Sequence, residues 1–342
     1  MSKPRCLTSF SLSELEDYFK SVGEPAYRAR QVFQGVYQRG LSDFSAFTDL
    51  PLALREKLAG EFLINPLELE QTASSTDGTV KYLFRLPDGF FVETVLIPSG
   101  DRKTACLSTQ VGCKFRCAFC ASGLNGFKRN LAAGEIVSQV LSLKFRLGHN
   151  LTNLVFMGMG EPLDNLENVL KSIRILNDEH GLNFGARRMT VSTAGVIPGI
   201  KKLKDFELQI NLSISIHSAT DQLRSRLMPI NKKYPLPELV EAAEDYIRSG
   251  GRQLTLEYIL IRDLNDSLYE AEGLAAIARR LKAKVNLIAY SPVPQLAYRR
   301  PEETEVVRFQ RWLEERKVKV TIRQSKGVDI AAACGQLAGK FQ

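Results

Sequence analysis

The spacing of hydrophobic positions changes part of the way along this chain. Over residues 11–60 they recur every three or four positions, which predicts helices. Ser11 and Glu14 form a capping box before the first helix, and Gly23 ends it. We therefore expect a small helical domain over residues 1–80.

After this domain, short apolar runs alternate with helix-length segments. A Pro-Asp-Gly turn at 87–89 predicts a hairpin between the first two runs. Strands that alternate with helices favour a parallel sheet with helices outside it. We therefore predict an α/β fold, with an open, partial (β/α) barrel over residues 81–342 and functional residues at the carboxyl ends of its strands. The predicted strands are 81–86, 90–97, 104–110, 153–157, 188–192, 209–216, 254–261, 284–290 and 319–323, and the predicted helices are 135–145, 164–177, 237–249, 269–283 and 302–315.

The composition is that of an ordinary soluble protein, with 44% hydrophobic and 25% charged residues. No apolar run at the N-terminus resembles a signal peptide, and none reaches the roughly eighteen residues of a membrane span. The six cysteines are too few and too clustered for a secreted disulfide framework. We expect a cytoplasmic protein without membrane contact. Its 46 basic and 38 acidic residues, a net charge of +8, favour a polyanionic partner.

Three of the cysteines lie close together as Cys113-x-x-x-Cys117-x-x-Cys120. Three thiolates are one fewer than an ordinary four-iron cluster takes, so one iron keeps an open position for a ligand. A structural zinc ion is the alternative, but it needs a fourth ligand nearby, and the next histidine along the chain is His149. The spacing therefore predicts a [4Fe–4S] cluster. With Phe119 before the third cysteine, it resembles the signature of the radical S-adenosylmethionine (SAM) enzymes, whose open iron binds SAM.

Glycine and polar residues follow three of the predicted strands. The runs are Met-Gly-Met-Gly-Glu-Pro-Leu-Asp-Asn at 157–165, Val-Ser-Thr-Ala-Gly at 191–195 and Ser-Ile-His at 215–217. Glycine lets the backbone approach a ligand closely, and the carboxylate of Glu161 can accept from an ammonium group. Because the carboxyl ends of barrel strands meet at one face, we expect these runs and the cysteine loop to share a cofactor site.

Two further motifs make the resemblance more specific. They are Leu-Met-Pro-Ile-Asn at 227–231 and Asp-Ile-Ala-Ala-Ala-Cys-Gly-Gln-Leu at 329–337. Together with the cysteine triplet and the strand-end runs, they resemble the RlmN-type RNA adenine methyltransferases over essentially the whole chain. That family usually has Asn, which contacts SAM, where this chain has Ser291. The resemblance implies a helical RNA-binding domain before a radical SAM barrel, with cofactor contacts from Gly160, Glu161, Ser192, Ser215, Ile216, His217 and the position of Ser291.

The resemblance also implies a reaction at carbon 2 of adenosine that uses two SAM molecules per turnover. Cys334 would take a methyl group from one SAM, and a second SAM at the cluster would yield the radical that activates this methyl group. Cys106 would then attack the Cys334 sulfur and leave a transient disulfide bond. Glu93 resembles the family's proton acceptor, and the Cys106 thiolate is its rival for that role.

The implied partners are 23S ribosomal RNA, some transfer RNAs and an electron donor such as flavodoxin or ferredoxin, and the enzyme would be a monomer. A basic, aromatic helix around Tyr27, Arg28 and Arg30 suits an RNA-facing surface, although it also fits a solvated basic face. The carbon-8 branch of the family shares the cysteines but typically has Ala-Leu-Ala-Asn where this chain has Pro-Leu-Asp-Asn at 162–165, which favours carbon 2. A non-catalytic RNA-binding protein with a structural metal is the alternative from another class.

Overall fold

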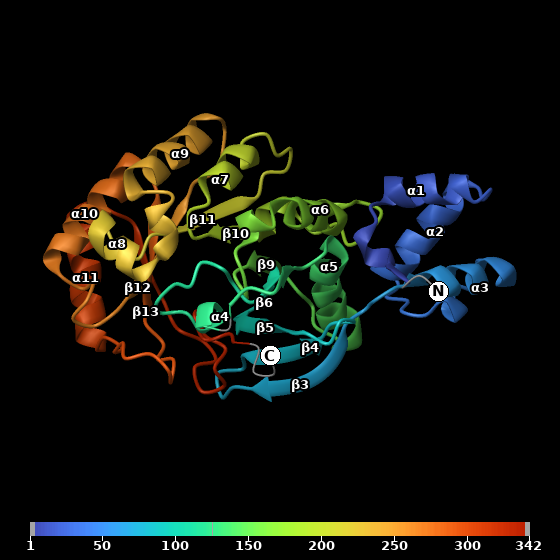
Figure 1. Ribbon diagram of the computed structural model, residues 1–342, viewed down its shortest axis with the longest axis horizontal. Helices are drawn as coiled ribbons and strands as arrows, with labels where there is room; N and C mark the ends of the chain where they lie inside the picture. Colours follow the sequence, from blue (N-terminus) through green and yellow to red (C-terminus); the bar gives the residue numbers. More distant parts are fainter. Residues whose placement is uncertain (1–3, 125, 339–342) are drawn as a thin grey trace.

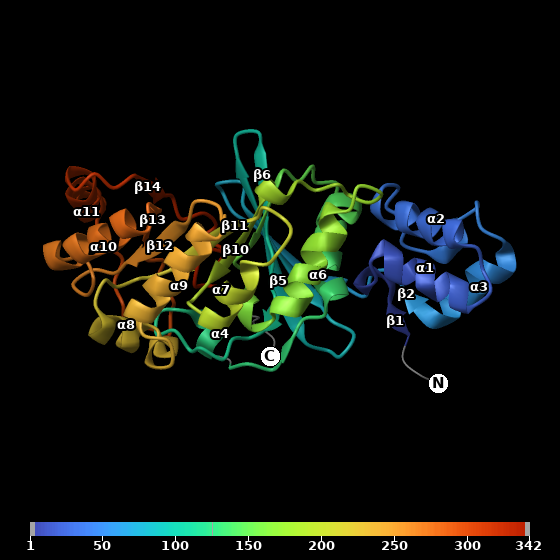
Figure 2. The same ribbon diagram turned by 90° about the horizontal axis from the view of Figure 1, so that it is seen from above.

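The computed structural model of the protein describes residues 4–124 and 126–338. A large curved sheet occupies the body of the molecule, helices cover its outer face, and a helical lobe lies at one end (Figure 1). Figure 2, seen from above, separates this lobe from the sheet and its helices. The predicted α/β fold class, with a partial barrel and an N-terminal helical region, is confirmed.

The N-terminal lobe is built from three helices around an aromatic and aliphatic core. These are α1 (Leu12–Ser21), α2 (Ala26–Tyr37) and α3 (Leu52–Glu61), and the short strands β1 (Arg5–Cys6) and β2 (Phe62–Leu63) pair in parallel beside them. Ser11 Oγ accepts from the Glu14 amide at 3.2 Å and the Glu14 carboxylate accepts from the Ser11 amide at 2.8 Å, so the predicted capping box is present. The core side chains include Leu15, Phe19, Phe33, Phe47 and Leu58, all buried.

Among the described residues, the main sheet has the strand order β14-β13-β12-β11-β10-β9-β6-β5-β4-β3. Strands β6 and β9 to β14 are parallel, whereas β3 to β6 form an antiparallel meander. β3 lies within the segment 1–80, and it pairs with β4 in this sheet. The strands are β3 (Glu68–Ser74), β4 (Val80–Arg85), β5 (Phe91–Ser99), β6 (Arg102–Cys106), β9 (Asn153–Phe156), β10 (Met189–Thr193), β11 (Asn211–Ser215), β12 (Thr255–Leu260), β13 (Lys284–Ala289) and β14 (Val320–Arg323).

Amphipathic helices follow most of the parallel strands, as the sequence pattern predicts. The strand predicted at 104–110 is shorter, because the chain leaves the sheet after Cys106 and Gln110 begins the separate two-stranded pair of β7 (Gln110–Val111) with β8 (Arg129–Asn130). None of the described helices is long and apolar enough to cross a bilayer. The helices are α4 (Ala121–Leu124), α5 (Ala133–Leu141), α6 (Leu166–Asn177), α7 (Ile197–Leu203), α8 (Asp221–Leu227), α9 (Leu236–Arg248), α10 (Leu268–Arg280) and α11 (Glu303–Glu315).

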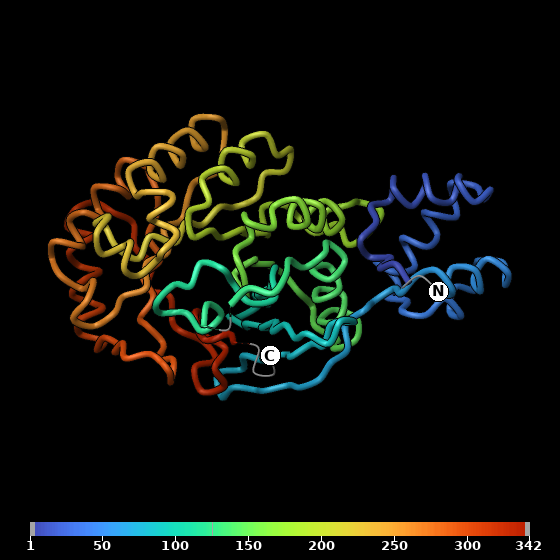
Figure 3. Tube along the Cα trace, in the orientation of Figure 1, coloured from blue at the N-terminus to red at the C-terminus, as the bar shows by residue number. Residues whose placement is uncertain are grey.

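The chain after β14 crosses the open side of the curved sheet and reaches its other edge. The Gly327 amide donates to Asp77 at 2.9 Å, and the Lys81 ammonium donates to the Ala331 carbonyl at 3.0 Å. Figure 3 shows this last segment, in red, beside the blue hairpin of β3 and β4. Residues 324–338 therefore close the partial barrel and hold Cys334 at the carboxyl ends of its strands.

Candidate active site

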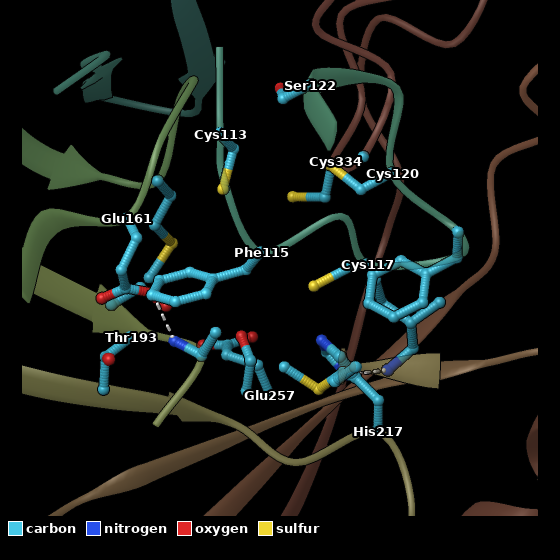
Figure 4. A pocket seen from close by; sticks show the side chains of 18 of the residues that line it. Cys113, Phe115, Cys117, Cys120, Ser122, Glu161, Thr193, His217, Glu257 and Cys334 are labelled. Carbon is cyan, nitrogen blue, oxygen red and sulfur yellow. Dashed lines mark hydrogen bonds between the residues drawn. The ribbon is translucent and has the colours of Figure 1, made fainter. Parts of the chain in front are cut away.

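The cysteine loop lies over the carboxyl ends of the parallel strands. Cys113, Cys117 and Cys120 line one cavity of about 150 Å³, which we call the main cavity (Figure 4). Two contacts hold the loop in place. The Ala118 amide donates to the Leu227 carbonyl at the end of α8, at 2.8 Å, and the Phe119 ring stands edge-on against His217. The predicted triplet is therefore assembled around one space by residues distant in sequence.

A glycine makes the turn before the first cysteine possible. Gly112 has a φ of +72°, and a Cβ built there would lie 1.7 Å from the Gly126 carbonyl oxygen. Any larger residue would push the two ends of the loop apart. The cysteine loop thus depends on a close backbone approach that the spacing of the cysteines does not reveal.

The three free thiols have the chemistry of iron–sulfur cluster ligands and supply three of the four that an ordinary [4Fe–4S] cluster takes. Burial raises the pKa of Cys113 to about 12 and also raises the pKa values of Cys117 and Cys120. These thiolates therefore need nearby positive charge, which iron ions would supply.

Glu161 lies at the end of β9, on the same cavity. The preceding Gly160 has a φ of +100° and presses against Gln110, so a side chain there would clash. The Glu161 carboxylate accepts from the amides of Leu163 at 3.0 Å and Ala194 at 2.7 Å. Burial nevertheless raises its pKa to about 7. A ligand ammonium group beside it would stabilise the charged form.

The other residues expected to contact SAM divide into two groups. Ser192, Ser215 and His217 line the cavity. Ile216 is buried, and Ser291 is buried as well, but the side chain of neither lines this cavity. His217 has a φ of +57°, its Nδ1 accepts from the Ile259 amide at 3.0 Å, and burial lowers its pKa to about 3. The imidazole is therefore neutral at physiological pH.

Arg224 on α8 does not line the cavity but supports it, and the sequence analysis missed this residue. Its side chain is fully buried, and its guanidinium donates to the carbonyls of Ala194 at 2.8 Å, Ser215 at 3.1 Å and Ile216 at 3.2 Å. It thus ties together the ends of β10 and β11 and lies close enough to Cys117 to interact with its charge. A charged residue on a short helix gives no sequence signal of such burial.

Cys334 links this cavity to a second one, of about 110 Å³. Cys334 and Arg323 line both cavities, whereas Cys106 lines only the second. The Ala121 amide donates to the Gly335 carbonyl at 2.7 Å, which fixes the segment that carries Cys334. Burial raises the pKa of Cys106 to about 12. Both cysteines are free thiols in this structure, so the predicted disulfide bond is not formed.

Glu93 on β5 does not line either cavity. Its carboxylate pairs with the largely buried Lys81 ammonium at 2.9 Å and accepts from the Ala338 amide at 2.8 Å. It lines a separate cleft, with Lys81, Ala331 and Gln336. The structure thus brings nine of the predicted site residues to the main cavity and leaves Glu93, Cys106, Ile216 and Ser291 outside it. The nine are Cys113, Cys117, Cys120, Gly160, Glu161, Ser192, Ser215, His217 and Cys334.

Comparisons with known proteins show the class of protein to which the chain belongs. A family model described as the radical SAM superfamily matches residues 107–273, and one described as the N-terminal domain of ribosomal RNA large subunit methyltransferases matches residues 6–64. A solved structure of a radical SAM methyltransferase from Sphaerobacter thermophilus aligns with a TM-score of 0.95 at 45% identity, covering 98% of this chain and all of that one. The protein is therefore a radical SAM enzyme.

Curated relatives show to which family of radical SAM enzymes the chain belongs. The relative from Geobacillus kaustophilus is 46% identical over 335 residues, which are 97% of this chain and 92% of the relative. One from Bacillus cereus is 45% identical over 342 residues, 99% of this chain and 94% of the relative. Both are named "Probable dual-specificity RNA methyltransferase RlmN". The chain belongs to the RlmN family of radical SAM RNA methyltransferases. This confirms the enzyme interpretation over the non-catalytic alternative.

Proposed function

We propose that the protein methylates carbon 2 of an adenosine in the peptidyl-transferase region of 23S ribosomal RNA, and of the adenosine 3′ of the anticodon in some transfer RNAs, through a methyl-cysteine intermediate. The position of Cys334 carries this proposal. It lines one cavity with the three cysteines of the loop and a second cavity with Cys106. A methyl carrier must reach both its methyl donor and the thiol that later releases it.

The cofactors of the family fit the residues that line the main cavity. Cys113, Cys117 and Cys120 would hold a [4Fe–4S] cluster, and Glu161 would accept from the ammonium group of SAM. When bound and reduced by a flavodoxin or ferredoxin, the cluster and SAM would supply a 5′-deoxyadenosyl radical. Arg224 would keep the strand ends of this site in place through its three carbonyl contacts.

Cys334 and Cys106 divide the remaining chemistry between them. The Cys334 sulfur accepts a methyl group from one SAM by displacement, and this methyl group then gives up one hydrogen atom, which ends in 5′-deoxyadenosine. Its carbon forms a bond to carbon 2 of adenine. The adduct then loses the carbon-2 proton to a base on the protein and one electron to the electron carrier. The Cys106 sulfur next attacks the Cys334 sulfur, so that a disulfide bond forms as the sulfur–carbon bond breaks, and the released carbon takes up a proton to become the methyl group of the product. External thiols then reduce the disulfide, and each turnover consumes two SAM molecules.

The base that removes the carbon-2 proton is one of two groups in this proposal. Cys106 shares a cavity with Cys334. Glu93 can act only if its ion pair with Lys81 opens, because in the present arrangement it lines a different cleft. Proton removal by either group requires that group to come within hydrogen-bond reach of the base carbon.

Nucleoside analysis of RNA from a deletion strain tests the function. We expect 2-methyladenosine to disappear from 23S ribosomal RNA and from the affected transfer RNAs, and to return with the intact gene but not with a Cys334→Ala variant. Loss of 8-methyladenosine instead would assign the protein to the carbon-8 branch. Unchanged methylation in both RNA pools would contradict the proposal. We further propose that the enzyme acts as a cytoplasmic monomer.

A further inference from the structure

Glu257 is an acidic residue in the middle of a buried strand. Every residue of β12 is buried, and the side chains alternate between its two faces. Tyr258 faces the helices, where its ring stacks on Phe309. Glu257 and Ile259 face the other way and line the main cavity. A carboxylate buried at such a position destabilises the protein unless a hydrogen-bond donor or a cation pairs with it.

The two carboxylate oxygens of Glu257 have different surroundings. Oε1 accepts from the Asn286 side-chain amide at 3.0 Å. Oε2 is buried and has no hydrogen-bond partner among the described residues. Burial raises the pKa of Glu257, and Arg323, Asn286, Ser213 and Lys284 oppose that effect. A buried acceptor without a donor destabilises the protein, so a ligand that donates to Oε2 would gain from doing so.

The position of Glu257 in the cavity indicates which part of a ligand it would meet. Figure 4 shows it across the cavity from Cys113 and Cys120. Its neighbour in the pairing of β11 with β12 is Ser215, and the apolar Ile288 lines the cavity from the next strand. If the amino-acid end of SAM lies at the cluster, its nucleoside extends across the cavity toward these residues. The Ser215 hydroxyl and the Glu257 carboxylate suit the hydroxyls of a ribose, and the apolar side chain of Ile288 suits the adenine base.

We propose that Glu257 binds SAM through its carboxylate, which accepts hydrogen bonds from the vicinal hydroxyls of the ribose. This assignment rests on the SAM-dependent function proposed above. Carboxylates bind ribose hydroxyls in the same way in dinucleotide-binding folds. Because hydrogen bonds to a charged acceptor are stronger than those to a neutral one, the contact should be measurable in binding.

The test removes a hydroxyl from the ligand and the charge from the protein, separately and together. Full-length protein with its cluster reconstituted is titrated anaerobically, by calorimetry, with S-adenosylhomocysteine and with its 2′-deoxy and 3′-deoxy forms. For the wild type we expect loss of a bonded hydroxyl to weaken binding about tenfold. For Glu257→Gln we expect the parent ligand to bind about tenfold more weakly, and loss of the hydroxyl to cost less than about threefold.

Glu161→Gln is the matched control, because it removes a carboxylate from the same cavity at the amino-acid end of the ligand. It should weaken all three ligands alike and keep the full dependence on the hydroxyls. If Glu257→Gln does not fold, Glu257→Asp, which withdraws the carboxylate, is tested in the same way. An unchanged hydroxyl dependence in a folded, cluster-containing Glu257 variant overturns the proposal, even if RNA methylation is slower. If the wild type binds none of the ligands, the SAM site itself is wrong.

Discussion

The main cavity and the N-terminal lobe use charged residues in opposite ways. Glu161 and Glu257 line the cavity and Arg224 supports the strand ends beside it, and burial shifts the pKa of each away from its ordinary value. The lobe has an apolar core and leaves Tyr27 and Arg30 exposed. Buried charges cost stability and remain where they bind ligands or hold a site together, whereas exposed charges act on partners from outside. The two regions should therefore respond differently to mutation.

The largest effect is expected at the cysteine loop. Replacing Cys113, Cys117 or Cys120 with Ala removes one of three cluster ligands, so iron retention and SAM cleavage should both be abolished. Iron analysis and detection of 5′-deoxyadenosine check this. Cys6→Ala is the control, because Cys6 lies in the N-terminal lobe and should leave both unchanged. A triplet variant with full iron content and turnover would contradict the ligand assignment.

The next largest effect is expected at Cys334 and Cys106, where substitutions should stop the reaction at two different steps. Cys334→Ala should keep the cluster but be unable to receive a methyl group. Cys106→Ala should accept the methyl group and then stall with RNA bound covalently to Cys334, because no thiol releases it. Mass spectrometry of the protein and gel analysis of the RNA distinguish the two. If no protein–RNA adduct forms in the Cys106 variant, the release step does not belong to Cys106.

A moderate effect on stability is expected at Arg224. Arg224→Met leaves three carbonyls at the strand ends without their buried donor, which should lower the free energy of unfolding by about 3 kcal/mol or more. Arg226→Met on the same helix is the matched control, because Arg226 is exposed. Its effect should be within about 0.5 kcal/mol. Anaerobic urea unfolding of the two variants decides the point, and equal destabilisation by both would contradict the role given to Arg224.

The smallest effect is expected in the N-terminal lobe. Arg30→Ala should weaken RNA binding and reduce the slope of log affinity against log salt by about 0.7–0.9, if Arg30 contacts one phosphate. Iron content and SAM cleavage should not change. Arg248→Ala, at the end of α9 and also exposed, serves as the control. Filter binding over a range of salt concentrations measures the slope, and identical slopes for both variants would argue against RNA contact by the lobe.

Much of the fold could be predicted because its signals are local. The alternation of strands and helices follows from residue spacing, and the capping box of Ser11 and Glu14 lies within four residues. The cysteine triplet and the strand-end glycines predicted the main cavity for the same reason. The burial of Arg224 and Glu257 could not be predicted, because it depends on strands and helices that meet only in the folded chain. The ion pair of Glu93 with Lys81 likewise depends on the pairing of β4 with β5.

The central claim is that the methyl group passes through Cys334 and loses a hydrogen atom before it reaches the RNA. Turnover with SAM that carries a trideuterated methyl group, followed by mass spectrometry of the nucleosides, tests this most directly. The account predicts 2-methyladenosine with two deuterium atoms in its methyl group, and one deuterium in the 5′-deoxyadenosine. A product that retains all three deuterium atoms would mean direct transfer, and would contradict the account.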